Sequence, residues 1–396
     1  MGREVFTIKS RTIALGTLPA FLLLVTVSRS LRAADRLEIW PVASLAEQLT
    51  DNLPQQTTSG ASSDAISLLN LGASATVDSE HRTFGLDYNT DTQVYARNSS
   101  LDRVFQDQYV GVRDYERVSA RTGVSLNDTF INGQQTFGQS LIGPAAATPL
   151  LSQALLQSTF LTNTFNLQVT HAWSERASTV LSVHQAFFST SGSQTSSSFS
   201  QGGELAGYYQ VFPRLSVGPD FQFNDFRFSN QPRQDSLQPS LAINWNRSKH
   251  LVTSARIGPI IFLSANETRL DFGYMLNTSY VGERWLFSLS SGRTPSISAG
   301  LSGASISQYE GAAAQYQVSR RTSVYVNASF NRFSQTTNNS YGIAFSTGIN
   351  HQVTRSIAIF GQFVRFQSNS PSLNGKVTDT VTFGIKFTPQ PWQWMF

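Results

Sequence analysis

The chain has no cysteine, few charged residues and, after its first 30 residues, no long apolar run. The missing cysteine excludes disulfide bonds, thiolate metal sites, cysteine nucleophiles and a lipid anchor on cysteine. Only 14% of the residues are charged, whereas soluble proteins have about 25%. Mean hydropathy is slightly negative, at -0.18, and no later segment reaches the roughly 18 apolar residues that a spanning helix needs. An ordinary soluble enzyme and a helical membrane protein are therefore both poor descriptions of this chain.

Residues 1–30 have the pattern of a secretory signal peptide. Three basic residues precede an apolar run over about residues 12–27, which a proline interrupts. We expect cleavage between residues 30 and 34, with an uncleaved N-terminal anchor as the alternative. Removing residues 1–30 takes four of the 29 basic and one of the 25 acidic residues, leaving 25 against 24. A net charge of +1 gives no basis for nucleic-acid binding.

The chain is rich instead in uncharged polar residues and in aromatics, with 28 Phe, 12 Tyr and 6 Trp. In the stretch 377–387, Val381, Phe383 and Ile385 alternate with threonine, glycine and lysine. Asp379 is the one charged residue on the apolar side of this alternation. A period of two with one apolar and one polar face predicts a strand that lies between two different solvents.

The same alternation recurs along the whole chain and predicts an all-β fold. Counting back from 377–387, the expected strands are 356–368, 339–352, 321–335, 303–317, 284–297, 267–281, 249–265, 235–246, 213–229, 197–211, 177–191, 159–173, 120–131, 103–116, 82–96, 64–79 and 37–49. We expect one domain over residues 35–396, a transmembrane antiparallel β-barrel of about 18 strands. The first strand contains Pro41 and Glu47, so a barrel of 16 strands is the alternative.

The predicted connections alternate between two kinds. Short ones are mostly built on serine or threonine with arginine, as at Ser174-Glu175-Arg176 and Ser319-Arg320-Arg321, and a new strand follows directly. The others are longer and polar, as at 191–198 and 367–375. Short turns at one end and long loops at the other distinguish a membrane barrel from a soluble sandwich. The short side should be periplasmic, with both termini there.

Three stretches resemble a known family of outer-membrane β-barrel proteins that is associated with exopolysaccharide and exosortase gene clusters. They read TFGLDYNTDTQVYARNSSLDRVFQDQYVGVRDYERVSARTGVSLNDTF (83–130), STFLTNTFNLQVTHAWSERASTVLSV (158–183) and YQVSRRTSVYVNASFNRF (316–333). The shared feature is the strand–Ser-x-Arg–strand rhythm rather than a functional signature. The resemblance implies an 18-stranded barrel in the bacterial outer membrane that serves as the exit for a secreted polysaccharide.

The C-terminus also resembles the assembly signal of bacterial outer-membrane barrels, in which the last strand ends on an aromatic residue. Here Pro389 and Pro391 follow Phe387. Because proline cannot donate to a strand ladder, we expect the last strand to end at Phe387 and the Trp-Gln-Trp-Met-Phe tail to lie outside the ladder.

The sequence offers little for catalysis or metal binding. The five histidines are scattered, and His171 and His351 fall on the outward-facing side of their strands. His184 should face the lumen beside Ser178 and Ser182, which is the one arrangement that a barrel hydrolase could use. No cluster has metal-ligand spacing and no glycine-rich phosphate loop is present. We expect no enzymatic activity, no cofactor and no metal.

The polar faces of the strands should line the lumen, because charged side chains within a spanning strand are costly on the lipid side. The lumen-lining candidates are Asp87, Asn89, Asp91, Glu204, Asp220, Asn224, Arg256, Asp271, Asn277 and Lys386. They serve either to solvate the wall and pair with one another, or to select what passes. Tyr309 is a further candidate, for stacking on a solute. The longest loop, 131–157, is expected to fold over or into the pore.

These features predict an outer-membrane channel, with export of a secreted polysaccharide as the specific hypothesis. A general or sugar-uptake porin and a plugged structural or adhesive surface barrel are the alternatives. The expected partners are outer-membrane lipid, the barrel assembly machinery and, for export, periplasmic polysaccharide-export proteins.

Overall fold

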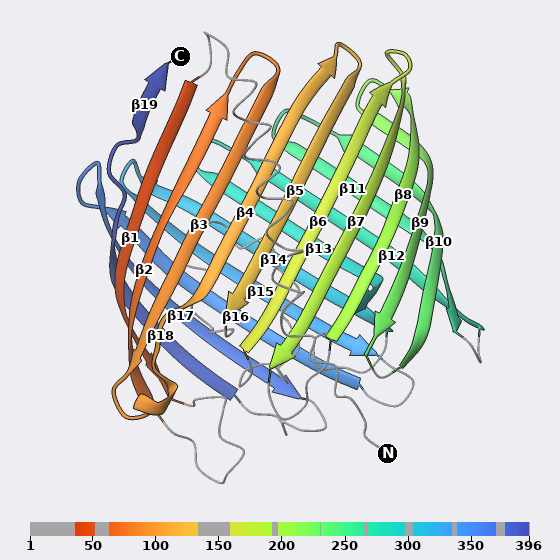
Figure 1. Ribbon diagram of the computed structural model, residues 1–396. Helices are drawn as coiled ribbons and strands as arrows, with labels where there is room; N and C mark the ends of the chain where they lie inside the picture. The colour runs from red at the N-terminus through yellow and green to blue at the C-terminus, as the bar shows by residue number, and fades with distance from the viewer. Residues whose placement is uncertain are drawn as a thin grey trace, which may run out of the picture.

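Within the residues that the structure describes, the chain forms a closed antiparallel β-barrel of eighteen long strands and one short terminal strand (Figure 1). The computed structural model describes residues 36–51, 63–133, 159–191, 197–229, 231–264, 268–297, 304–334, 339–369 and 377–395. The predicted signal peptide with its cleavage site, residues 134–157 of the longest loop, and Phe396 lie outside these residues. No helix among the described residues is long and apolar enough to cross a membrane.

The strands follow one another around the barrel in chain order. They are β1 (Arg36–Thr50), β2 (Asp64–Asp78), β3 (Arg82–Tyr95), β4 (Arg103–Ser119), β5 (Thr122–Gly133), β6 (Thr159–Ala172), β7 (Ala177–Ser191), β8 (Ser197–Phe212), β9 (Leu215–Phe228), β10 (Gln231–Asn246), β11 (Leu251–Ser264), β12 (Thr268–Val281), β13 (Trp285–Ile297), β14 (Ala304–Ser319), β15 (Thr322–Ser334), β16 (Asn339–Gln352), β17 (Ile357–Asn369), β18 (Val377–Phe387) and β19 (Trp392–Met395). A single 3-10 turn, η2 (Ser99–Leu101), lies between β3 and β4.

The barrel closes where β18 pairs with β1. The register places Leu45 opposite Ile385 and Leu49 opposite Val381, so the exposed apolar residues of the two strands share the outer face. Closure gives each long strand two hydrogen-bonded neighbours, which a sheet in lipid requires because no water is there to satisfy an open edge. The prediction of 18 strands is confirmed, and the 16-strand alternative is wrong.

The prediction for the C-terminal tail is wrong. β19 pairs antiparallel with the first residues of β1, with Trp392 opposite Ile39 and Trp394 opposite Leu37. Because β18 pairs only with Ala43–Thr50 of β1, the earlier part of β1 would otherwise be an open edge. The two prolines end β18 as expected, and the chain then re-enters the ladder beyond them. Pro41 lies in the interval of β1 that has no partner in β18 or β19, where a missing N–H costs least.

At one end of the barrel, here called the turn end, every connection is short, whereas the other end, called the loop end, carries the longer connections together with the short β9–β10 and β11–β12 links (Figure 1). Arg36 pairs with Met395 and with Asp78, just before a short turn, so both ends of the described chain lie at the turn end. Serine hydroxyls accept from turn amides: Ser174 Oγ from Arg176 N at 3.3 Å and from Ala177 N at 3.1 Å. This hydrogen bonding explains the Ser-x-Arg rhythm of the sequence, since the side chain satisfies amides that the ladder leaves free.

The outward face carries an apolar band that begins at the turn end. Its members are exposed large side chains such as Leu205, Phe221, Phe223, Leu241, Ile257, Leu289, Ile343, Phe345, Phe383 and Ile385. Trp173, Trp245, Trp285 and Trp392 lie at its turn-end margin, as in the aromatic girdles of membrane barrels. Toward the loop end the outward positions become polar, for example Asp225 after Phe223 and Arg293 after Leu289. This pattern makes the barrel a membrane-spanning one.

Candidate functional site: the lumen wall

Strand register separates the lumen wall from the lipid face. On β9, the exposed Phe221 and Phe223 point outward, so Asp220, Gln222 and Asn224 point inward. Residues opposite one another in neighbouring strands share a face, and the same reasoning places the inward residues of every strand. The wall is built mostly from Ser, Thr, Asn, Gln, Gly and Ala.

All ten predicted lumen residues fall on the inward face. Asp87, Asn89 and Asp91 share the inner face of β3 with one another, and Glu204, Asp220, Asn224 and Arg256 come from β8, β9 and β11. Asp271 and Asn277 lie on β12, and Lys386 on β18. Their role in selecting what passes stays a prediction.

Four of the inward residues form one polar cluster. Arg256 Nη2 donates to Glu204 Oε1 at 2.7 Å, and Arg256 Nε lies 2.5 Å from Asp220 Oδ2, an ionic contact that lacks hydrogen-bond alignment. Gln222 Nε2 donates to Glu204 Oε2 at 2.8 Å. Asp220 is fully buried and Arg256 is 12% exposed. The cluster therefore holds its charges within the wall, beneath the surface that a solute meets.

Small residues on β10 make this cluster possible. Arg256 lies on β11 and Asp220 on β9, so the arginine must cross β10 to reach its partner. The β10 residues opposite them are Ala242 and Ser240, and Ala242 is only 3% exposed. A larger side chain at either position would occupy the path of the guanidinium.

Further ion pairs lie on β3 and β4, on another part of the wall, and sequence reasoning missed their basic partners. Arg113 Nη2 lies 2.8 Å from Asp87 Oδ2, while Asn70 and Ser74 donate to Asp91 and Asp87. Toward the loop end, the buried Arg103 and Asp107 pair at 2.6 Å. The alternation of β4 around Tyr109 could have shown that Asp107 and Arg113 share a face. The pairing of Arg103 could not be read, because an irregularity at Phe105, with φ 52°, interrupts the strand.

Three tyrosines lie along the wall over glycines. A Cβ on Gly292 would meet Tyr309 Cζ at 2.5 Å, and one on Gly348 would meet the Tyr325 ring at 2.6 Å. Tyr109 covers Gly111 in the same way. The glycines give the rings room to lie along the wall, as in aromatic rescue of strand glycines. Tyr309, predicted as a stacking candidate, thus packs on its neighbouring strand.

Three of the five histidines each contact a polar side chain of another strand. His184 Nε2 and Asn224 Oδ1 are 2.7 Å apart on the inward face. His171 and His351 each contact a threonine hydroxyl, at 2.9 Å, near the turn end. Within the described residues, no group of three or more His, Asp or Glu could hold a metal ion.

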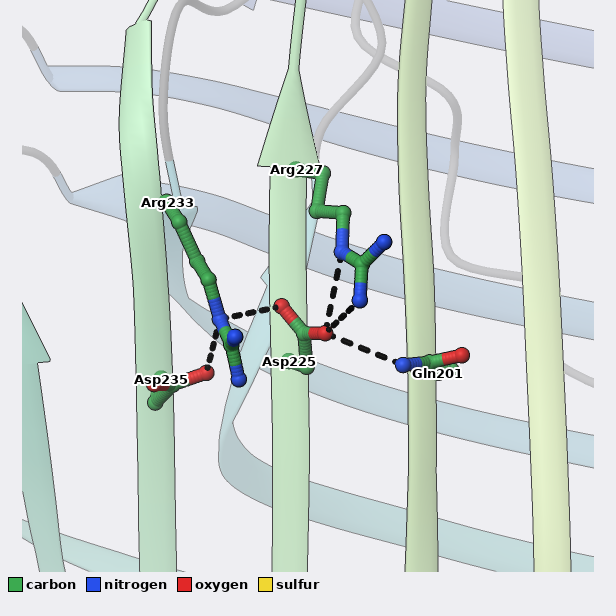
Figure 2. A network of polar contacts seen from close by, with 5 residues as sticks. All are labelled: Gln201, Asp225, Arg227, Arg233 and Asp235. Carbon is green, nitrogen blue, oxygen red and sulfur yellow. Dashed lines mark hydrogen bonds and ion pairs between the residues drawn. The ribbon is translucent and has the colours of Figure 1, made fainter.

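Some charged residues lie outward, contrary to the expectation that charges in strands line water. Asp128, opposite the outward Phe165, accepts from Asn163 Nδ2 at 2.7 Å, and Glu47 accepts from Ser67 Oγ at 2.7 Å. Figure 2 shows a larger outward network at the loop end, where Asp225 contacts Arg227, Arg233 and Gln201. Each outward acid has a local donor, which reduces the cost of its position.

No protein-family model matches the sequence, and no curated protein matches it. Among solved structures, OpdQ of Pseudomonas aeruginosa is 11% identical, with 90% of this chain and 98% of that chain covered and a TM-score of 0.43. The outer membrane protein OpdK of the same organism is 13% identical over 91% and 99%, with a TM-score of 0.44. OccAB4 of Acinetobacter baumannii is 10% identical over 91% and 98%, with a TM-score of 0.42. Likenesses this weak carry no inference about what passes through this barrel.

Proposed function

We propose that the chain is an outer-membrane channel for uncharged, hydroxyl-rich solutes. The observation that carries this proposal is the charge pairing of the lumen wall. Arg256 is held by Glu204 and Asp220, and Arg113 by Asp87. Apart from single charges such as Lys386, the remaining wall offers mainly hydroxyl and amide groups, which can exchange hydrogen bonds with a sugar but do not attract an ion of either sign.

The size and closure of the barrel support transport. Barrels of 16 to 18 strands characteristically leave a water-filled interior, whereas eight strands are filled by side chains. The apolar band and the closed ladder suit the outer membrane, with the short turns and both chain ends on the periplasmic side. Outer-membrane lipid and the barrel assembly machinery would then be its obligatory partners.

Within this function, we infer export of a secreted polysaccharide by way of periplasmic export proteins. Support comes from the resemblance of residues 83–130, 158–183 and 316–333 to barrels associated with exopolysaccharide clusters, and from the uncharged wall. A sugar-uptake porin would use the same wall in the opposite direction and is the second candidate. A plugged surface barrel is the third candidate. For a hydrolase, the relevant contact of His184 is with Asn224 and not with Ser178 or Ser182.

Deletion of the gene separates export from uptake. For an exporter, the deletion strain should lose most of its secreted polysaccharide, and the wild-type gene should restore it. Secreted sugar is measured in the medium alongside uptake of labelled mono- and disaccharides. Normal secretion with reduced uptake would contradict the export proposal and favour the porin. Both rates unchanged would contradict transport altogether.

A further inference from the structure

The barrel wall is incomplete between β12 and β13. Pairing runs from Val281 opposite Leu286 only as far as Tyr274 opposite Arg293. In the stretch 268–297, which the structure describes without a gap, Thr268–Gly273 has no partner in β13. The end of β13 pairs only with β14 there. An unpaired strand edge facing lipid is costly unless something else satisfies its backbone groups.

Two side chains satisfy the backbone groups of Phe272, one residue of the unpaired stretch. Asp271 Oδ1 accepts from Phe272 N at 2.8 Å, and Arg293 Nη1 donates to Phe272 O at 3.0 Å. Arg293 Nη1 also lies 2.6 Å from Asp271 Oδ1. Arg293 occupies an outward position and Asp271 an inward one, so this ion pair passes through the opening in the wall.

A cavity lies on the outward side of this opening. It has a volume of about 320 Å³ and is lined by Tyr274, Arg293, Ile306, Gln308, Arg332 and Ser334. All six occupy outward positions of β12 to β15, by the register that pairs Tyr274 with Arg293 and Gln308 with Arg332. Ile306 is 1% exposed although its strand position is outward, so the cavity is recessed into the surface.

The lining is basic and only partly neutralised. The contacts of Arg293 use Nη1, so its Nε and Nη2 have no partner among the described residues. Arg332 likewise makes no hydrogen bond or ion pair with any residue in the described part of the chain. Glu310 is close along β14 but accepts from Gln308 Nε2, at 3.3 Å, and does not line the cavity. Two guanidinium groups with free donors match a phosphate group in both charge and geometry.

Because the cavity lies on the outward face next to the apolar band, a lipid is the favoured source of that phosphate. On β13 the strand continues from Arg293 toward the turn end with Leu289 and Phe287, which are exposed members of the apolar band. A headgroup in the cavity would thus leave its acyl chains against apolar side chains. We propose that this cavity binds the phosphorylated headgroup of a glycolipid of the outer leaflet. The proposal depends on the membrane-spanning barrel and is independent of what the lumen carries.

The network of Figure 2 provides a contrast on the same face. Arg227 and Arg233 are each more than half exposed there, but both guanidinium groups are tied to Asp225, which is 1% exposed. Arg233 also contacts Asp235 at 3.1 Å. Internal carboxylates already fill the place of an anion, so this network is not expected to bind one.

The test is lipid binding by the purified full chain in detergent micelles. The probes are a diphosphorylated glycolipid, the same lipid without its phosphates, and inorganic phosphate. We expect the phosphorylated lipid to bind wild type at least about tenfold more tightly than either other probe. Arg332→Gln should weaken this binding about tenfold, because it removes one of the two guanidinium groups that contact the phosphate. It should leave the barrel folded, because Arg332 has no partner among the described residues. Arg293→Gln should weaken the binding to the same extent, provided that its gel mobility shift on heating confirms a folded barrel.

Arg365→Gln is the matched control, because Arg365 also lies outward near the loop end and is 58% exposed. It should bind the lipid like wild type. An equal loss of binding in Arg365→Gln would show that the lipid is attracted to outward arginines in general and is not bound in this cavity, which would overturn the proposal. Unchanged binding in Arg332→Gln, or equal binding of the phosphate-free lipid or of inorganic phosphate, would overturn the proposal.

Discussion

Replacing Arg256 with methionine is expected to lower the free energy of unfolding of the barrel by about 3–5 kcal/mol, the usual cost of removing one partner of a buried ion pair. Arg256 neutralises both Asp220, which is fully buried, and Glu204, which is 20% exposed. Methionine fills a similar volume, so the lost charge rather than a cavity dominates the effect. The measurement is urea unfolding in lipid vesicles, followed by tryptophan fluorescence.

The matched control removes all three charges together. In Glu204→Gln/Asp220→Asn/Arg256→Met, no buried charge is left without a partner, so most of the lost stability should return. If Arg256→Met alone cost less than about 1 kcal/mol, the cluster would behave like an exposed ion pair. The wall would then not hold its charges in the buried state described here.

Proline at Thr382 is expected to prevent assembly of almost the whole population. Thr382 is 1% exposed and lies in the closing strand, opposite Gln48 of β1 and Gln362 of β17. Proline removes the N–H and disturbs a strand that has neighbours on both sides. The fraction of folded barrel is measured by the gel mobility shift on heating of outer-membrane preparations.

Gln390→Pro controls for the presence of another proline near the C-terminus. Gln390 lies between β18 and β19, in the segment without ladder pairing. It should give wild-type amounts of folded barrel. Wild-type assembly of Thr382→Pro would show that β18 does not close the barrel.

The strands could be predicted because each separates lipid from water, and this contrast is written in the sequence as alternation. β10 was predicted as 235–246 but begins at Gln231, and its first four residues were not recognised because the outward residues there are polar. β19 was missed because the proline argument considers only the local chain. The partner of β19 is an open edge on β1, at the other end of the chain. Such an edge depends on the unequal lengths of β1 and β18.

The inward face of the candidate site could be predicted, but its contacts could not. Parity places Asp220 and Arg256 in the lumen, yet their pairing across β10 depends on the small Ala242 and Ser240 and on strand register. The outward Asp128 illustrates the converse. A carboxylate on the lipid side of β5 was not expected, and only the neighbouring strand supplies the Asn163 amide that accompanies it.

The central claim, a channel for uncharged hydroxyl-rich solutes, is tested most directly by liposome swelling with the purified barrel. Neutral sugars of graded size should enter at rates that fall smoothly with size. Charged sugar acids and amino sugars of equal size should enter at similar rates, because the main charges of the wall, at Arg256 and Arg113, are paired with carboxylates. Absence of swelling with the smallest neutral sugar, or a strong preference for one sign of charge, would contradict the account.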